Sequence, residues 1–271
     1  MGSTPISIKE VVKVSFALGY AAYLKMMKVN SRKVVLYYHD IKVEHVSNFR
    51  KQMKYLADTY KVVKPSEIRT IHPDNNEHLV AITIDDAFEN VYENALPVLK
   101  DYDLPAAVFA PVGNLGEKPK WYIPDGCEAK EFTVMTDRQI IDVDRQGFEI
   151  FSHTFSHPRL TEIDNNMLNQ EIAESKDYLE QLLGHEVCAI SYPHGDHDER
   201  VCGAAVEAGY TLGFTVSPSM ISKTTDSMKI GRFKVMSDES LVKFKLKCTG
   251  AFHILQTLYS LKAVALRSSN S

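Results

Sequence analysis

The chain has 271 residues, enough for one large domain or two small ones, and its hydrophobic fraction of 44% is ordinary for a globular protein. A formal net charge of −4 favours neither a nucleic-acid-binding protein nor one with a strongly acidic tail. The cysteines are widely spaced and form no CxxC pair, so we expect scattered thiols instead of a disulfide framework or a zinc knuckle.

The first predicted element is an apolar helix in an N-terminal segment, residues 1–32. Lysines flank its uncharged stretch from Val14 to Leu24, which is shorter than the roughly 20 apolar residues that cross a bilayer. A helix docked on the domain and an amphipathic helix lying on a membrane both fit this pattern. A signal-peptide core is a third interpretation, although no clean small-x-small cleavage site follows it.

The central region, residues 33–236, alternates short apolar runs with helical patterns. Such alternation predicts a parallel sheet or barrel, in which the chemistry collects at the C-terminal ends of the strands. Asp164 is a plausible N-cap for the clearest helix and Gly184 its stop. We expect strands at 34–38, 79–84, 106–110, 147–153, 189–192 and 211–216, and helices at 46–57, 89–100, 137–145, 165–183 and 199–208.

A C-terminal segment, residues 237–271, is basic and apolar, and we expect it to form amphipathic helix. Its lysines stand at positions 243, 245, 247 and 262. Both ends of the chain therefore look cationic and amphipathic, while the middle carries the acidic excess. This asymmetry is a hint of peripheral contact with an anionic membrane through the terminal helices.

Histidine or aspartate follows four of the expected strands. His39 follows the first of them, and His153 and His157 follow "GFEIFS". The spacing of these last two is i, i+4, so in a helical turn both imidazoles would reach one ion. With a carboxylate they would form a triad that suits catalytic zinc or another divalent transition metal. The plain alternative is a pair of surface histidines.

Two adjacent carboxylates, Asp85 and Asp86, end the strand "AITI". Their mutual repulsion needs an explanation, and a cation bound by one of them supplies it. The other carboxylate would stay free to take a proton from an attacking water. A helix N-cap would explain one aspartate but not the second.

These motifs resemble the polysaccharide deacetylase family, also called the NodB-homology domain or carbohydrate esterase family four. The family's motif TFDDG stands here as "TIDDA", its histidine motif as "SHTFSHP" and its R-x-P-x-G motif as "SYPHG". The resemblance runs from about Val34 to Val235. It implies an α/β fold, a distorted (β/α) barrel with fewer than eight strands.

The resemblance also implies the roles of individual residues. It makes Asp85 the general base, and Asp86, His153 and His157 the ligands of a divalent ion, most readily Zn²⁺. The backbone N–H of His194 would help to form an oxyanion hole.

The chain departs from the family pattern at three places. Ser191 stands where the family has an arginine beside the base, and Arg232 is a possible replacement. Ala87 replaces a glycine. The regions "TLGFTVSPS" and "KIGRFKVMS" lack the family's acid histidine, which leaves His39 and the His194 side chain as candidate general acids.

The resulting hypothesis is a metal-dependent N-deacetylase that acts on an amino sugar in a glycan or lipid-linked precursor, in bacterial envelope or exopolysaccharide biosynthesis. We expect a cytoplasmic protein, peripheral on the inner membrane, with a secreted or periplasmic location left open, and no nucleic-acid partner. One alternative is a metal-dependent C–N hydrolase of a small non-sugar amide. Another is a degenerate, non-catalytic barrel that binds a glycan or a partner.

Overall fold

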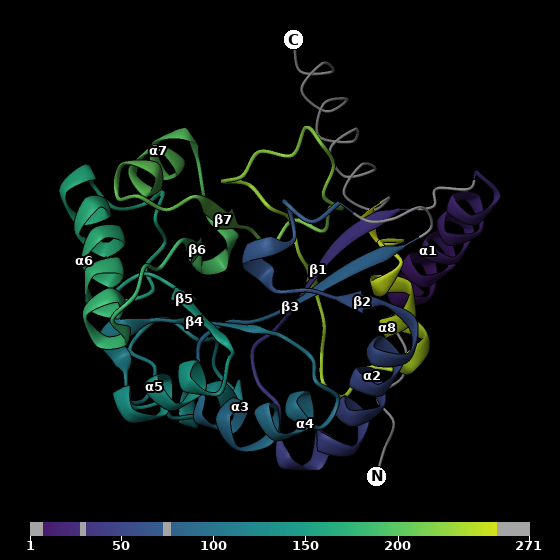
Figure 1. Cartoon of the computed structure of the whole chain (residues 1–271), viewed down its shortest axis with the longest axis horizontal. Helices are drawn as coiled ribbons and strands as arrows, with labels where there is room; N and C mark the ends of the chain where they lie inside the picture. The colour runs from purple at the N-terminus through teal and green to yellow at the C-terminus, as the bar shows by residue number, and fades with distance from the viewer. Residues whose placement is uncertain (1–7, 28–30, 73–76, 254–271) are drawn as a thin grey trace.

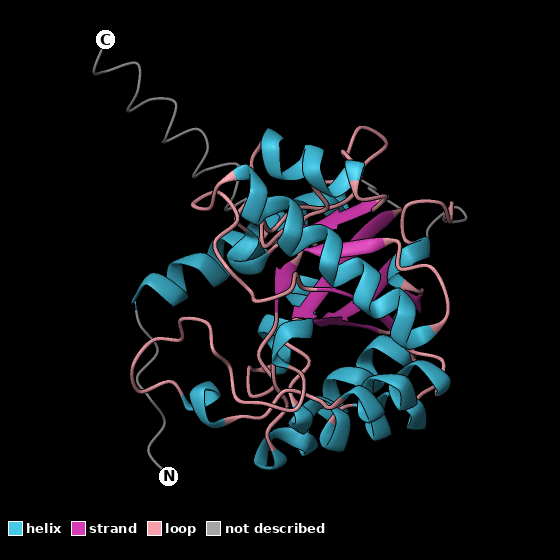
Figure 2. Ribbon diagram, turned by 90° about the vertical axis from the view of Figure 1, so that its left-hand side faces the viewer, coloured by secondary structure: helices cyan, strands magenta, loops and turns pink. Residues whose placement is uncertain are grey.

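The computed structural model describes residues 8–27, 31–72 and 77–253. A curled sheet of parallel strands forms its centre, with helices packed around the outside (Figure 1, Figure 2). The strands run in the order β7-β6-β5-β4-β3-β1-β8, and the short β2 pairs with β3 beside this path. Their bounds are β1 Arg32–Tyr38, β2 Lys61–Val62, β3 His78–Ile84, β4 Ala107–Ala110, β5 Glu149–Ser152, β6 Ala189–Ser191, β7 Leu212–Phe214 and β8 Phe233–Lys234.

The sheet nearly closes on itself at the segment that leads into β8. Phe214 of β7 forms a parallel bridge with Ile230, and the N–H of Thr215 donates to the Ile230 carbonyl at 2.8 Å. Three residues later, Phe233 pairs with Leu36 of β1. One segment thus touches both edges of the curled sheet, which confirms the predicted distorted barrel.

Continuous apolar sequence explains why the strands occupy the centre. In β3, all residues after His78 are buried, as expected where helices and the curled sheet cover both faces of a strand. The surrounding helices are α2 Val46–Thr59, α3 Glu89–Asn94, α4 Leu96–Asp101, α5 Asp137–Arg145, α6 Asn165–Leu183 and α7 Glu199–Glu207.

Local signals set the ends of α6. The Asp164 carboxylate accepts the Met167 N–H at 2.9 Å, and Gly184 ends the helix with φ of 76°. The single helix expected over residues 89–100 is wrong in one respect, because the structure breaks it at Ala95 into α3 and α4. Pro97 explains the break, since a proline inside a helix cannot donate its hydrogen bond and clashes with the preceding turn.

The terminal helices are α1 Ile8–Met26 and α8 Leu241–Cys248, and α1 packs on α8. None of the helices in the described ranges combines the length and the apolar character that a membrane crossing needs. The division into segments 1–32, 33–236 and 237–271 stays a prediction. Residues 1–7 and 254–271, including the lysine at position 262, lie outside the described residues.

Candidate active site

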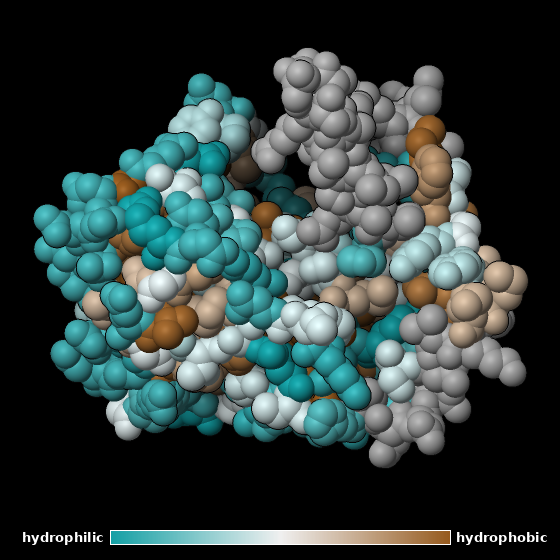
Figure 3. Space-filling view, turned by 90° about the horizontal axis from the view of Figure 1, so that it is seen from above, coloured by the Kyte–Doolittle hydropathy of each residue, from teal (hydrophilic) through white to brown (hydrophobic). Residues whose placement is uncertain are grey.

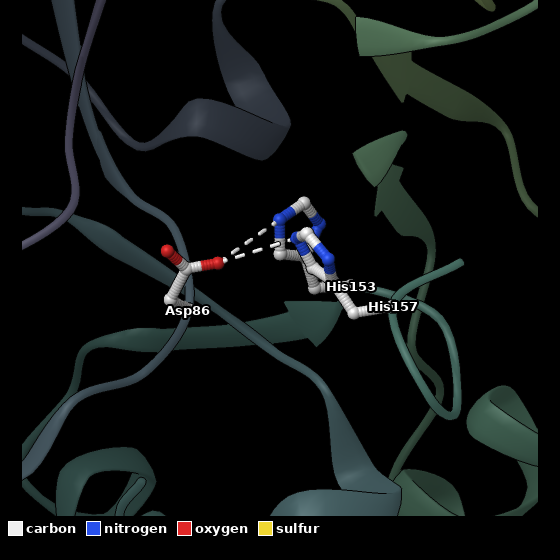
Figure 4. A group of neighbouring side chains, drawn as sticks. All are labelled: Asp86, His153 and His157. Atoms are coloured by element: carbon white, nitrogen blue, oxygen red, sulfur yellow. Dashed lines mark ion pairs between the residues drawn. The ribbon is translucent and has the colours of Figure 1, made fainter. Parts of the chain in front are cut away.

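Three buried side chains converge at the C-terminal ends of β3 and β5. Figure 4 shows Asp86, which follows β3, facing His153 and His157, which follow β5. The Asp86 Oδ1 atom lies 3.5 Å from Nε2 of His153 and 3.4 Å from Nε2 of His157. One potential ligand atom from each residue lies within 4.8 Å of the others. The strand ends therefore bring together the two nitrogens and one oxygen that the sequence singles out.

The backbone that brings the histidines together is a loop, so the expectation of a helical turn is wrong. Thr154 and His157 have φ of 65° and 64°, in the left-handed region. Glu171 of α6 holds the loop, because its carboxylate accepts the Ser156 N–H at 2.7 Å and also the Ser156 hydroxyl. An anchored loop turns both imidazoles towards Asp86, as a helical turn would have done.

Left-handed backbone is concentrated around this site. Besides Thr154 and His157, it includes Asp86 at φ 69°, Ala87 at 48° and His194 at 59°. Such conformations cost side-chain-bearing residues on the order of 1 kcal/mol or more each and gather at functional sites. Ala87 adopts the conformation that the family's glycine would take freely.

The triad has the properties of a metal site. Within the described part of the chain, the buried Asp86 Oδ1 atom has no hydrogen-bond partner. Nδ1 of His153 lies 2.7 Å from the Ser191 carbonyl, which leaves its Nε2 directed at Asp86. Burial favours a higher pKa for Asp86, but the two imidazoles hold that pKa well below its usual range.

The spacing of the ligand atoms also fits a transition metal. Atoms bound at about 2.0–2.1 Å to a tetrahedral ion lie about 3.4 Å apart, close to the separations from Asp86. Two imidazoles and a carboxylate are a donor set that zinc and similar ions accept. The residues present therefore fit one divalent ion held by Asp86, His153 and His157.

The carboxylate of Asp85, unlike that of Asp86, pairs with a fully buried arginine. Arg232 donates from Nη1 to Oδ1 of Asp85 at 2.7 Å and from Nη2 to Oδ2 at 2.8 Å. Its Nη2 also donates to the Ser191 hydroxyl at 2.7 Å, so the guanidinium lies beside the residue that replaces the family's arginine. Burial alone would raise the pKa of Asp85, but Arg232 and His153 lower it below its ordinary value.

Aromatic rings complete the surroundings of the guanidinium. Its central carbon lies 4.6 Å from the ring centre of Tyr37, 5.4 Å from that of Phe109 and 5.9 Å from that of Phe214. These faces stabilise a buried cation and keep it oriented. The contact between Arg232 and Asp85 that the sequence suggested is present, and its effect on turnover stays a prediction.

Replacing Arg232 with methionine should lower turnover and cost about 3–5 kcal/mol of unfolding free energy in the metal-free protein. The reason is that the variant leaves the buried Asp85 carboxylate without its cation. Urea unfolding measures the loss. Arg50→Met is the matched control, since the exposed pair of Arg50 with Asp101 is screened by water and should contribute little to stability. Equal, small losses in both variants would show that Arg232 does not support the base.

The two candidate acids differ in position. His39 follows β1, and because Tyr38 pairs with Ile84, it stands level with Asp85 at the strand ends. Burial lowers the pKa of His39, while Asp86 and Asp85 oppose this shift. His194 is exposed at the pocket, in the turn Pro193–Gly195, with its ring 4.8 Å from that of His157.

Although His194 is exposed as a residue, partial burial together with His157 and nearby cationic groups lowers its pKa to about 4. Its imidazole is therefore neutral near pH 7 and cannot deliver a proton as a cation. His39 stays a candidate acid, because Asp86 and Asp85 oppose the lowering of its pKa by burial. The family resemblance assigns a role to the backbone N–H of His194, which stands in this turn with φ of 59°.

A pocket of about 450 Å³ opens over these residues, lined among others by His39, Asp85, Asp86, His153, His157 and His194. Sequence inspection missed its aromatic wall. Trp121 stacks on His157 with ring centres 4.6 Å apart and also on Phe88 at 6.2 Å. Little in the sequence indicated that Trp121 lines the pocket. It is the single tryptophan, and it lies in a loop rich in proline and glycine. An aromatic wall beside polar groups suits a ring-shaped, partly apolar ligand such as a sugar.

Comparison with known proteins agrees with this geometry. A family model described as "Polysaccharide deacetylase" matches residues 72–213. The Bacillus subtilis (strain 168) protein YxkH, named as a candidate polysaccharide deacetylase, is 28% identical over 224 residues, which cover 79% of this chain and 75% of YxkH.

Two further relatives are informative. The poly-β-1,6-N-acetyl-D-glucosamine N-deacetylase of Staphylococcus epidermidis is 24% identical over 175 residues, which are 60% of this chain but only 57% of that protein. The structure of the Streptococcus pyogenes deacetylase PplD in complex with acetate superimposes with a TM-score of 0.67 at 22% identity, covering 80% of this chain and 98% of that one. This last likeness shows the shared fold.

Proposed function

Because the chain belongs to the polysaccharide deacetylase family, we propose that it is a metal-dependent hydrolase that removes N-acetyl groups from an amino sugar of a glycan or lipid-linked polysaccharide precursor. The observation that carries the proposal is the convergence of Asp86, His153 and His157 beside the Arg232-bound Asp85 at one pocket. The name of the staphylococcal relative supports an N-acetylglucosamine polymer and a role in exopolysaccharide biosynthesis.

Asp86, His153 and His157 would hold the ion, which when bound polarises a carbonyl and lowers the pKa of water to about 7. Asp85 accepts the proton of the attacking water, because Arg232 keeps it ionised and fixed in orientation. The backbone N–H of His194 donates to the oxyanion that develops on the acetyl carbonyl oxygen when water attacks the carbonyl carbon. A donor placed in this way contributes about 3 kcal/mol to transition-state stabilisation.

His39 donates the proton that the departing sugar amine needs. The substitution His39→Asn should therefore slow amide hydrolysis by roughly 10²-fold or more. An activated aryl acetate has a leaving group that needs no proton, so its hydrolysis should change by less than about threefold. Comparing both substrates on each variant separates proton donation from general damage to the site.

His194→Gln is the matched control, since this histidine also lines the pocket. We expect it to lower the two rates to a similar, smaller extent. If His194→Gln instead shows the selective loss on the amide, the acid is His194 and the assignment to His39 fails.

The rival functions give different results in a substrate panel. Acetate release should be measured from N-acetylglucosamine oligomers, from an N-acetylated amino acid and from a buffer blank. The proposal requires release from the oligomers. Release from the amino acid alone would favour a hydrolase of small amides, and no release from either, with the metal bound, would favour a non-catalytic barrel.

A further inference from the structure

We propose that α1 and the adjacent α8 form a surface that docks on a membrane containing anionic lipid. The location predicted from the sequence, peripheral on the inner membrane, is part of this proposal. It does not depend on the proposed catalytic function, because α1 and α8 contribute no residue to the pocket lining.

The first observation is that α1 is apolar on both of its sides. Ala17 and Leu24 are buried against the rest of the protein. The opposite side carries exposed large apolar side chains, which we call the α1 face: Val12, Phe16, Leu18, Tyr23, Met26 and Met27, with exposed fractions between 47% and 72%. They are six of the thirteen large hydrophobic residues exposed in the described ranges, five on α1 and Met27 directly after it.

Most members of this face form a continuous stripe. Val12, Phe16, Tyr23 and Met26 are separated by four, seven and three residues, the spacing of one side of a helix. The right-hand side of Figure 3, where Figure 1 places α1, shows tan and brown apolar side chains at the surface. A concentrated apolar stripe of this kind marks an interaction surface.

The second observation is the charge of the surrounding sequence. No aspartate or glutamate occurs between Glu10 and Asp40, whereas lysine or arginine stands at positions 13, 25, 28, 32 and 33. After Glu239 there is again no acidic residue. Of the α8 lysines, Lys245 is exposed, whereas Lys243 and the buried Lys247 lie against Glu239. Arg32 donates to the Thr249 carbonyl at 2.8 Å, so the two basic segments lie together.

This combination favours lipid over a second copy of the chain. Pairing two copies through α1 would bring together two segments, residues 11–39 of each copy, that carry basic but no acidic residues. A leaflet with anionic head groups supplies the opposite charge along with an apolar layer for Phe16 and Met26. Because none of the described helices is suited to cross a bilayer, the helix would lie in the interface.

Vesicle flotation of the full chain tests the proposal. We expect binding to phosphatidylcholine vesicles that contain phosphatidylglycerol, weak binding to phosphatidylcholine alone, and release by salt. The double variant Phe16→Ser/Tyr23→Ser should lower the partition coefficient at least about tenfold, because two apolar side chains no longer enter the interface. Met167→Ser, at a half-exposed position of α6, is the matched control and should bind as the original chain does.

Acetate release from a soluble oligomer and the thermal midpoint should be the same in all three proteins, which separates docking from folding and catalysis. Light scattering, done in parallel, measures whether two copies of the chain form a dimer. The proposal is overturned by absence of binding to anionic vesicles, by equal binding of the double variant, or by a dimer that the double variant dissociates.

Discussion

Replacing Asp85 with asparagine should lower turnover by roughly 10²–10⁴-fold while the protein still binds one divalent ion. Asparagine has nearly the same shape but cannot accept a proton from water at neutral pH. The ion would be held by Asp86 and the histidines, which the substitution leaves in place. Turnover and metal content, measured on the same sample, give the result.

Asp40→Asn is the matched control, because Asp40 is a half-buried carboxylate that lines the same pocket without touching the triad. Its turnover should stay within about threefold of the original, since it loses no proton acceptor. Asp85→Asn also weakens the contact with Arg232, so the comparison should be made well below its thermal midpoint. Retained activity in Asp85→Asn, or loss of the ion together with activity, would overturn the division of roles between the two carboxylates.

The substitution Asp86→Asn should instead weaken metal binding by more than about 100-fold and reduce activity to background at equimolar metal. Loss of an outer partner of a ligand already lowers affinity by about 10–100-fold, and loss of the carboxylate ligand itself should exceed that. The same reasoning applies to His157→Ala. Calorimetric titration of the metal-free variants gives the affinities.

Excess metal distinguishes the two aspartates further. Asp86→Asn should regain part of its activity as the metal concentration rises, because its defect is in binding. Asp85→Asn should not respond, since it binds the ion but lacks the base. A variant of Asp86 with undiminished metal affinity would show that the ion is held elsewhere.

Sequence reasoning succeeded where local signals decide the structure. The bounds of α5 and α6 follow from apolar spacing and from caps such as Asp164 and Gly184, which act within a few residues. The buried parallel strands follow from continuous apolar runs. Their C-terminal ends then place Asp86 and His153 near each other without further information.

The remaining features depend on contacts that sequence spacing does not encode. His153 and His157 meet because Glu171 anchors a loop with left-handed residues, although the spacing suggested a helical turn. The closure at Ile230 rests on its backbone hydrogen bonds with Gly213 and Thr215, which no periodic pattern in the sequence predicts. Trp121 reaches the pocket through a loop whose path is set by tertiary packing.

The arginine beside the base shows both the strength and the limit of this reasoning. The family resemblance places an arginine beside the base where this chain has Ser191, and a cation there would keep a carboxylate next to a second one ionised. The late "KIGRFKV" segment offered Arg232 as a possible replacement, with a surface arginine as the alternative. The sequence could not show how Arg232 is held. In the folded barrel it donates to both oxygens of Asp85 and to the hydroxyl of Ser191.

Titration of the metal-stripped protein with Zn²⁺, while acetate release from N-acetylglucosamine oligomers is followed, tests the central claim most directly. The account predicts no release without metal, a rise in rate with each addition, and saturation at one ion per chain. Release by the stripped protein in the presence of chelator, or no release when Asp86, His153 and His157 are shown to hold an ion, would contradict it.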